Sequence, residues 1–290
     1  MTRHGRGQLA AVLAISILIL VAELVVGVLS NSLAVLADAG HVFADVVGTA
    51  IALAALRIAD RPATRDRTFG FYRFEILAAV LNAVLLFAIA AYVLIEAVRR
   101  LSTPPEIDGA PMVLIATAAL AGNAVSVWLL RAGQHRSLNL RAAYLEVLND
   151  MLGAGAVLVA GLVIAATGFV RADAIASGLI GLLILPRTWR LLREAIDILL
   201  EATPRGVDLD EVRRHILEAP GVRAVHDLHA WTITSGMNVV SAHVTIEENA
   251  SSAAVLDHLC RCLSSQFDIE HSTFQLETED RMSREFAAHV

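Results

Sequence analysis

Long apolar windows separated by short polar segments run through the first two thirds of the chain. They cover approximately residues 8–29, 33–58, 74–98, 110–130, 142–170 and 173–190, and the helix predicted from the last window spans 173–198. At about 1.5 Å of rise per helical residue, each window is long enough to cross a hydrocarbon layer of about 30 Å. The pattern predicts a transmembrane domain of six helices within residues 1–200, and we expect the sixth helix to continue past Pro186 as an amphipathic run.

Beyond residue 205 the pattern changes to short alternating runs that are typical of a small α+β domain. The predicted order is helix, strand, strand, helix, strand over residues 205–279, followed by a tail at 280–290. Asp208 and Glu211 fit the start of the first of these helices, and Pro220 with Gly221 fits its end. The predicted fold class is thus an α-helical membrane protein with a C-terminal αββαβ domain.

Composition and charge place this fold in a membrane and give it a direction. Hydrophobic residues make up 56% of the chain and its mean hydropathy is +0.62, which is too apolar for a soluble protein. The chain has no lysine, and thirteen arginines flank the helix ends facing residue 1, against Arg99, Arg100 and Arg171 opposite. The positive-inside rule predicts that both termini and the C-terminal domain are cytoplasmic. The net charge of −6 gives no reason to expect nucleic-acid binding.

Ionisable side chains interrupt the second and fifth windows at helical spacing. In "LADAGHVFAD", His41 and Asp45 are four residues apart, and Glu146 and Asp150 have the same spacing in "YLEVLNDMLG". Each pair lies on one helix face. Charges at membrane depth cost at least a few kcal/mol each, so they normally face a cavity or a partner inside the bundle. Two such pairs predict one shared site between two helices.

The residue types of this site indicate metal chemistry. An imidazole and carboxylates are ligands of first-row transition metals, and four of them would complete a tetrahedral zinc-type site. Three carboxylates and a neutral imidazole carry −3, which a divalent ion reduces to −1, whereas the empty site would have to take up protons. Exchange of metal for protons is therefore our hypothesis. The alternatives are a structural polar cluster, a metal channel that uses the same residues, and an intramembrane metalloenzyme.

An enzyme is the weaker alternative, because no H-E-x-x-H-like motif with a general base accompanies these ligands. A channel would differ from an exchanger in the proton dependence of its flux. We therefore predict a secondary transporter and no catalytic residues.

At these residues the chain resembles the cation diffusion facilitators, a family of transporters for zinc and other divalent metals. "NSLAVLADAGHVFADVVG" resembles the family's D-x-x-H-x-x-x-D signature, and "RTFGFYRFEILAAVLNAVLLF" resembles the segment that follows it. "GVRAVHDLHAWTI", "SAHVTI" and "HSTFQLE" are similar to its cytoplasmic domain. The resemblance implies a proton-coupled exporter of Zn²⁺, a homodimer, and a metallochaperone-like cytoplasmic domain, in the plasma membrane of a prokaryote.

One departure from the family pattern concerns the metal. Zinc-selective members usually carry histidine where this chain has Glu146. Glutamate is a harder ligand that favours Mn²⁺ or Fe²⁺ more than a second histidine would. Zn²⁺ remains the first expectation, and a transporter that prefers Mn²⁺, Fe²⁺ or Co²⁺, or has a broad range, is the alternative.

Other polar residues within the windows have secondary roles in this interpretation. Asp38 precedes His41 by three residues and is expected either to accept the second N–H of that imidazole or to face water at the site entrance. Asn82 and Asn123 are expected to form interhelical hydrogen bonds. The role of Glu23 is left open.

The C-terminal domain holds a second candidate metal site. Strand alternation places His243 with Ser241 and Thr245 on an exposed polar face, to which Glu277 also belongs. By resemblance, His226, His243 and Glu277 occupy positions where some relatives bind regulatory Zn²⁺. Gln275 stands where such relatives can have histidine, so a polar surface without metal stays the alternative.

Overall fold

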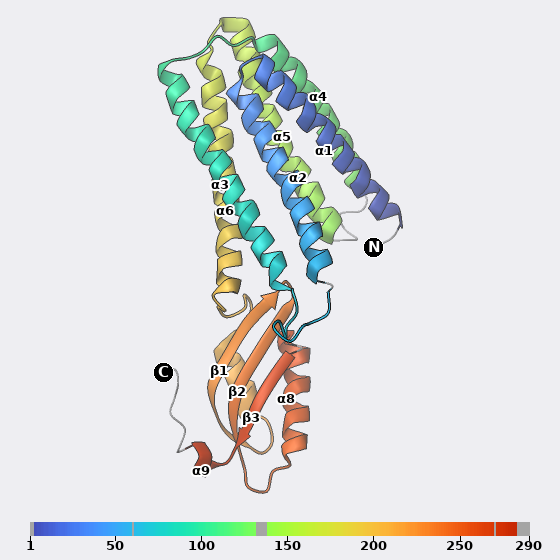
Figure 1. Cartoon of the computed structure of the whole chain (residues 1–290), viewed down its shortest axis with the longest axis vertical. Helices are drawn as coiled ribbons and strands as arrows, with labels where there is room; N and C mark the ends of the chain where they lie inside the picture. The colour runs from blue at the N-terminus through green and yellow to red at the C-terminus, as the bar shows by residue number, and fades with distance from the viewer. Residues whose placement is uncertain (1–2, 60, 132–137, 270, 283–290) are drawn as a thin grey trace. The chain divides into compact units, whose positions relative to one another are not determined.

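The computed structural model describes residues 3–59, 61–131, 138–269 and 271–282. Within these residues six helices are long and apolar enough to cross a membrane (Figure 1). They are α1 (Arg3–Leu29), α2 (Leu33–Ala59), α3 (Arg73–Ser102), α4 (Gly109–Leu130), α5 (Leu138–Thr167) and α6 (Arg171–Leu199). The predicted six-helix membrane fold is confirmed.

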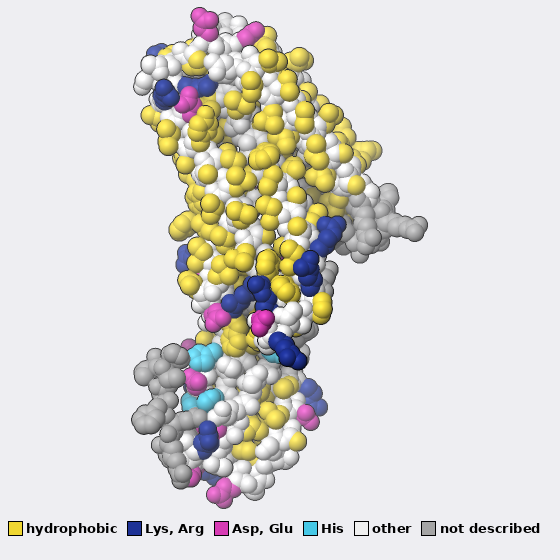
Figure 2. Space-filling model, in the orientation of Figure 1, with side chains coloured by type: hydrophobic (Ala, Val, Ile, Leu, Met, Phe, Trp, Pro, Cys, Tyr) yellow, Lys and Arg dark blue, Asp and Glu magenta, His cyan; other side chains and the backbone are white. Residues whose placement is uncertain are grey.

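Large hydrophobic side chains lie on the outside of these helices. Leu18, Ile95 and Leu114 are among the most exposed, and Figure 2 shows apolar side chains spread over the visible side of the bundle. An apolar surface of this extent requires lipid as its solvent.

The fifth helix is shifted toward the N-terminus from its predicted window, whereas the sixth follows the prediction closely. α5 begins at Leu138, four residues earlier than expected, and ends before Gly168, whose positive φ of 71° suits glycine at a helix C-terminus. α6 continues through Pro186 to Leu199 without interruption, as predicted. The early start of α5 carries its acidic pair deeper into the bundle than the apolar boundary alone suggests.

A buried carboxylate on α6 caps the start of α2. Asp173 accepts hydrogen bonds from Ser32 Oγ at 2.5 Å and from the backbone N–H groups of Leu33 and Ala34 at 2.9 and 3.1 Å. The first backbone N–H groups of a helix have no partner within the helix, and its N-terminus favours negative charge. One side chain therefore both caps α2 and fixes it to α6.

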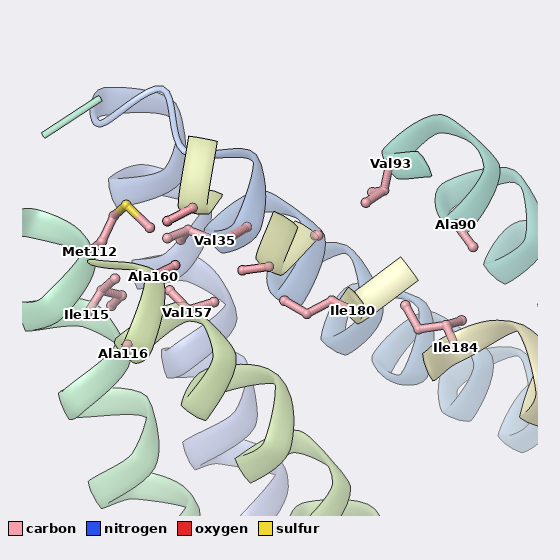
Figure 3. Packing of buried hydrophobic residues seen from close by; sticks show 14 of the residues in the cluster. Val35, Ala90, Val93, Met112, Ile115, Ala116, Val157, Ala160, Ile180 and Ile184 are labelled. Carbon is pink, nitrogen blue, oxygen red and sulfur yellow. The ribbon is translucent and has the colours of Figure 1, made fainter. Parts of the chain in front are cut away.

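Small residues allow α4 and α5 to approach closely. A Cβ atom at Gly109 would lie 2.6 Å from the backbone oxygen of Gly161, and one at Gly161 would lie 3.0 Å from Met112 Cβ. Figure 3 shows Met112 of α4 and Val157 of α5 in the core cluster with residues of α2, α3 and α6. Close packing of this kind holds membrane helices together where the hydrophobic effect cannot.

The C-terminal part has the predicted αββαβ order. Its elements are α7 (Leu209–Leu217), β1 (Val222–Thr234), β2 (Met237–Ile246), α8 (Ser252–Phe267), β3 (His271–Glu277) and the short α9 (Glu279–Met282). The sheet order is β1-β2-β3, with β2 antiparallel to β1 and parallel to β3. Asp208 is the N-cap of α7, as predicted, because its side chain accepts from the N–H groups of Asp210 and Glu211.

The chain forms two compact units. One comprises Met1–Leu53 with Ala79–Leu192, and the other comprises Ala54–Ala78 with Arg193–Val290. Within the second unit, Glu75 at the start of α3 accepts hydrogen bonds from Thr234 and Ser235 at the β1–β2 turn. These bonds link the start of α3 to the β1–β2 turn within this unit.

Candidate metal sites

The structure brings the four predicted membrane ligands together. α2 carries His41 and Asp45, and α5 carries Glu146 and Asp150; each offers one ligand atom, and these atoms all lie within 4.8 Å of one another. His41 Nε2 lies 3.6 Å from an Asp45 oxygen and 3.9 Å from an Asp150 oxygen. The imidazole thus directs Nε2 at the carboxylates.

The antiparallel register of α2 and α5 explains this convergence. Asp45 lies at the level of Glu146, and His41 at the level of Asp150. One step further along both helices, a Cβ atom at Gly153 would overlap the Asp38 carboxylate. The intervals between the three levels are three and four residues on both helices. The polar residues of α2 and those of α5 therefore have the same spacing along the two helices, so each faces a partner at its own level.

Burial is uneven across the site. His41 is 6% exposed and Asp150 9%, whereas the side chains of Asp45 and Glu146 are 27% and 28% exposed. A small cavity of about 20 Å³ on the buried side is lined by Asp38, His41 and Asn149 among others. Asp45 and Glu146 thus form the more accessible side of this cluster.

The hydrogen bond expected between Asp38 and His41 is not formed. His41 Nδ1 is buried and has no hydrogen-bond partner among the described residues. The buried Asp38 carboxylate lies instead against Gly153, because that glycine leaves room for it. Asn149, which sequence reasoning passed over, places its amide nitrogen 3.5 Å from His41 Nε2.

Arg187 on α6 is a second residue of this site that sequence reasoning missed. Both of its terminal nitrogens bind the Glu146 carboxylate, with Nη1 2.6 Å from Oε1 and Nη2 in contact with Oε2. In the sequence it counted only as one of the boundary arginines. With its charge included, three carboxylates and one guanidinium carry a formal −2, which one divalent ion would balance.

Three further polar residues that the sequence singled out lie in the membrane helices. Glu23 of α1 is buried, and its Oε2 has no partner among the described residues. Asn82 packs on α2, where a Cβ atom at Gly48 would lie 2.5 Å from its amide. We expected an interhelical hydrogen bond, but its buried Oδ1 has no hydrogen-bond partner among the described residues. Asn123 is buried in α4.

The three residues predicted for the C-terminal site also converge. His226 on β1 is opposite His243 on β2 in the strand register, and their rings lie 5.2 Å apart. Glu277 at the end of β3 places one oxygen 3.2 Å from His243 Nδ1 and the other 3.6 Å from His226 Nε2. One ligand atom from each of the three lies within 4.8 Å of the others.

The face that carries this cluster is more covered than the sequence suggested. Glu277 is only 3% exposed and Thr245 is fully buried, so the expectation of an exposed polar face was wrong for these two residues. The Gln275 amide donates to Glu277 at 2.6 Å. A register shift in β1 with Asp227 at φ 50° brings that carboxylate to 3.9 Å from His243 and 2.9 Å from His229.

Comparison with family models identifies the protein family of this chain. The model described as the cation efflux transmembrane domain matches residues 9–200, and the model of the cation efflux protein cytoplasmic domain matches residues 204–279. The chain belongs to the cation efflux family. This is the family of the cation diffusion facilitators, which the sequence motifs resembled.

Named cation efflux relatives cover nearly the whole chain. The metal cation efflux system protein CzcD of Cupriavidus metallidurans is 45% identical over 97% of this chain and 90% of that protein. The zinc transporter ZitB of Escherichia coli is 41% identical over 88% and 82%. The cadmium, cobalt and zinc/H(+)-K(+) antiporter of Bacillus subtilis is 35% identical over 95% and 91%.

A similar solved structure is the metal-bound C-terminal domain of the CzcD transporter. It is 43% identical to this chain, the match covers 24% of this chain and 99% of that chain, and the TM-score is 0.24.

Membership of the cation efflux family makes this chain a multi-pass membrane transporter of metal cations and not an enzyme.

Proposed function

We propose that this chain exports divalent transition-metal cations from the cytoplasm in exchange for protons, with Zn²⁺ as the expected cargo. The observation that carries the proposal is the convergence of one imidazole and three carboxylates from two antiparallel helices within the apolar bundle. Such groups are costly at membrane depth unless they serve an ion. The relatives named above as zinc, cadmium and cobalt transporters support the same cargo class.

The charge of the site supplies the reason for exchange. His41 in its neutral form, three carboxylates and Arg187 together carry −2, and a bound divalent ion brings this to zero. When the ion leaves, two negative charges would remain in a low-dielectric setting, which is unfavourable for the return step. Protons entering from the opposite side restore neutrality, and this requirement couples metal export to proton import.

The choice of metal follows from the donor set. One imidazole nitrogen with carboxylate oxygens suits Zn²⁺ and Co²⁺ as well as the harder Mn²⁺ and Fe²⁺. Zn²⁺ is favoured because His41 directs a nitrogen into the site. A broad-range transporter is the second candidate, because the Bacillus subtilis relative is named for three metals.

The remaining assignments rest on charge asymmetry and on the family. We propose that residues 1–200 form the transport domain, with both termini in the cytoplasm and the chain in the plasma membrane of a bacterium. Residues 205–279 would form a cytoplasmic domain that supports a homodimer and binds regulatory Zn²⁺ through His226, His243 and Glu277. The three-residue cluster of this domain supports the second metal site.

Inside-out vesicles that contain the full-length chain test the transport proposal. With an acidic vesicle lumen, Zn²⁺ uptake is expected to rise, and an ionophore that collapses the pH gradient should abolish the increase. Asp45→Ala and Asp150→Ala should each lower the rate to that of empty vesicles. Flux that follows only the metal gradient would indicate a channel, and wild-type rates in either variant would refute the shared site.

The cytoplasmic site has its own test. Full-length protein with His243→Ala should bind about one Zn²⁺ fewer per chain at equilibrium than the parent, while Asp45-dependent binding persists. His258→Ala, which removes an exposed histidine of α8, is the control and should leave the stoichiometry unchanged. Equal stoichiometry in parent and His243→Ala would favour a polar surface without metal.

A further inference from the structure

Arg187 occupies an unusual position for a membrane-boundary arginine. It directly follows Pro186 in α6, and its neighbour Thr188 is buried in the bundle. Its side chain is 44% exposed, yet its guanidinium turns back to α5 and holds both oxygens of Glu146. Arg190, one turn further on, is also exposed. Arg187 is thus placed for a specific contact.

The bidentate contact divides the four candidate ligands into two kinds. Glu146 is engaged by a cation that belongs to the protein. Asp150 Oδ1 is buried and has no hydrogen-bond partner among the described residues, and it lies 3.9 Å from His41 Nε2. Asp45 lies 3.6 Å from the same nitrogen and also forms a side-chain hydrogen bond with Glu146. His41, Asp45 and Asp150 are therefore the three donors that Arg187 does not engage.

We propose that Arg187 sets the affinity and the selectivity of the transport site by competing with the cargo for Glu146. The transported ion is bound by His41, Asp45 and Asp150, while Glu146 remains paired with Arg187. This inference rests on the transport site proposed above. It assigns to Arg187 a role that its place among the boundary arginines does not reveal.

Side-chain chemistry explains why arginine suits this role. The guanidinium is planar, keeps its charge at any physiological pH, and matches a carboxylate with two parallel hydrogen bonds. It therefore removes hard oxygen donors from the ion and adds a nearby positive charge. Both effects weaken cation binding, and the loss of oxygen ligands disfavours Mn²⁺ more than Zn²⁺. A site with three carboxylates can in this way release its cargo and still prefer zinc.

Metal binding by the purified full-length protein tests this role. Competition with a chelating fluorescent indicator gives the affinities for Zn²⁺ and Mn²⁺, and subtraction of the binding that survives in Asp45→Asn isolates the transport site. Arg187→Gln should raise the Asp45-dependent affinity for both ions by about tenfold or more, with the larger gain for Mn²⁺. Arg187→Lys, which keeps the charge but loses the bidentate geometry, should give a gain of a few fold.

A double-variant cycle identifies the partner. In a Glu146→Gln background, Arg187→Gln should change the affinity by less than about threefold, because the competition has no carboxylate to act on. Arg190→Gln is the matched control on the same helix and should leave the affinity unchanged.

Three results would overturn the inference: unchanged or weaker binding in Arg187→Gln, an undiminished gain in the Glu146→Gln background, or an equal gain in Arg190→Gln. If Arg187→Gln does not elute as a folded protein, Arg187→Lys alone tests the inference. An unchanged metal affinity in Arg187→Lys would then show that Arg187 does not compete with the ion for Glu146. Failure of the transport site itself looks different, because Asp45→Asn would then bind as much metal as the parent.

Discussion

At the scale of single residues, Glu146 is the position at which this chain departs from the commoner family pattern. Its replacement by histidine removes the carboxylate that Arg187 engages and supplies a borderline nitrogen that can bind the ion together with His41, Asp45 and Asp150. It also frees Arg187, whose half-exposed side chain can turn to water. We expect the preference for Zn²⁺ over Mn²⁺ to increase by about tenfold in Glu146→His.

The pH profile of this variant is a second readout. An introduced imidazole has an unperturbed pKa of about 6.5 and binds metal only when it is neutral. The transport rate should therefore be highest above that pH and fall as the pH drops through it. Zinc and manganese transport across roughly pH 5.5 to 8 measures both effects. An unchanged ion preference together with an unchanged profile would place Glu146 away from the ion's surroundings.

The sequence revealed the ligands but not all of their partners. His41, Asp45, Glu146 and Asp150 could be found because charged pairs at helical spacing are conspicuous within apolar windows. Arg187 could not, because nothing in its spacing shows that α6 turns this side chain toward a carboxylate 41 residues earlier. Glu277 was taken as exposed because strand alternation identifies a face, whereas its burial depends on the neighbouring residues.

At the scale of elements, the start of α2 depends on a residue of α6. Asp173→Ala would leave Ser32 Oγ and the N–H groups of Leu33 and Ala34 without their acceptor in a buried place. Each such buried group costs about 1–3 kcal/mol. We expect a loss of roughly 3 kcal/mol or more in the free energy of unfolding, visible in thermal unfolding of the detergent-solubilised protein.

The control for this prediction is the cap of α4. Asp108 is exposed and accepts one hydrogen bond, from the N–H of Ala110. Asp108→Ala should therefore cost only about 0.5–2 kcal/mol. Equal destabilisation by the two substitutions would show that Asp173 acts as an ordinary cap and does not hold α2 to α6. The sequence did not reveal this link, because a cap from a distant helix leaves no local motif.

At the scale of the whole molecule, the orientation is the property on which the direction of transport depends. Thirteen arginines on one side against three on the other predict that both termini are cytoplasmic. A reporter that is active only in the cytoplasm should be active when it is fused after residue 290 and inactive when it is inserted between α3 and α4, near Pro104. The opposite pattern would reverse the orientation and turn the proposed exporter into an importer.

The matched spacing of polar residues on α2 and α5 restricts how these two helices can move relative to each other while their donors stay together. If one helix slid along the other by four residues, Asp45 would come level with Asp150, and His41 with Ala154, while Glu146 would lose its counterpart. The complete set of donors therefore exists at only one axial offset of the two helices. For the proposed transporter, we therefore expect α2 and α5 to rotate or tilt together during transport, because translation of one helix along the other would separate the donors.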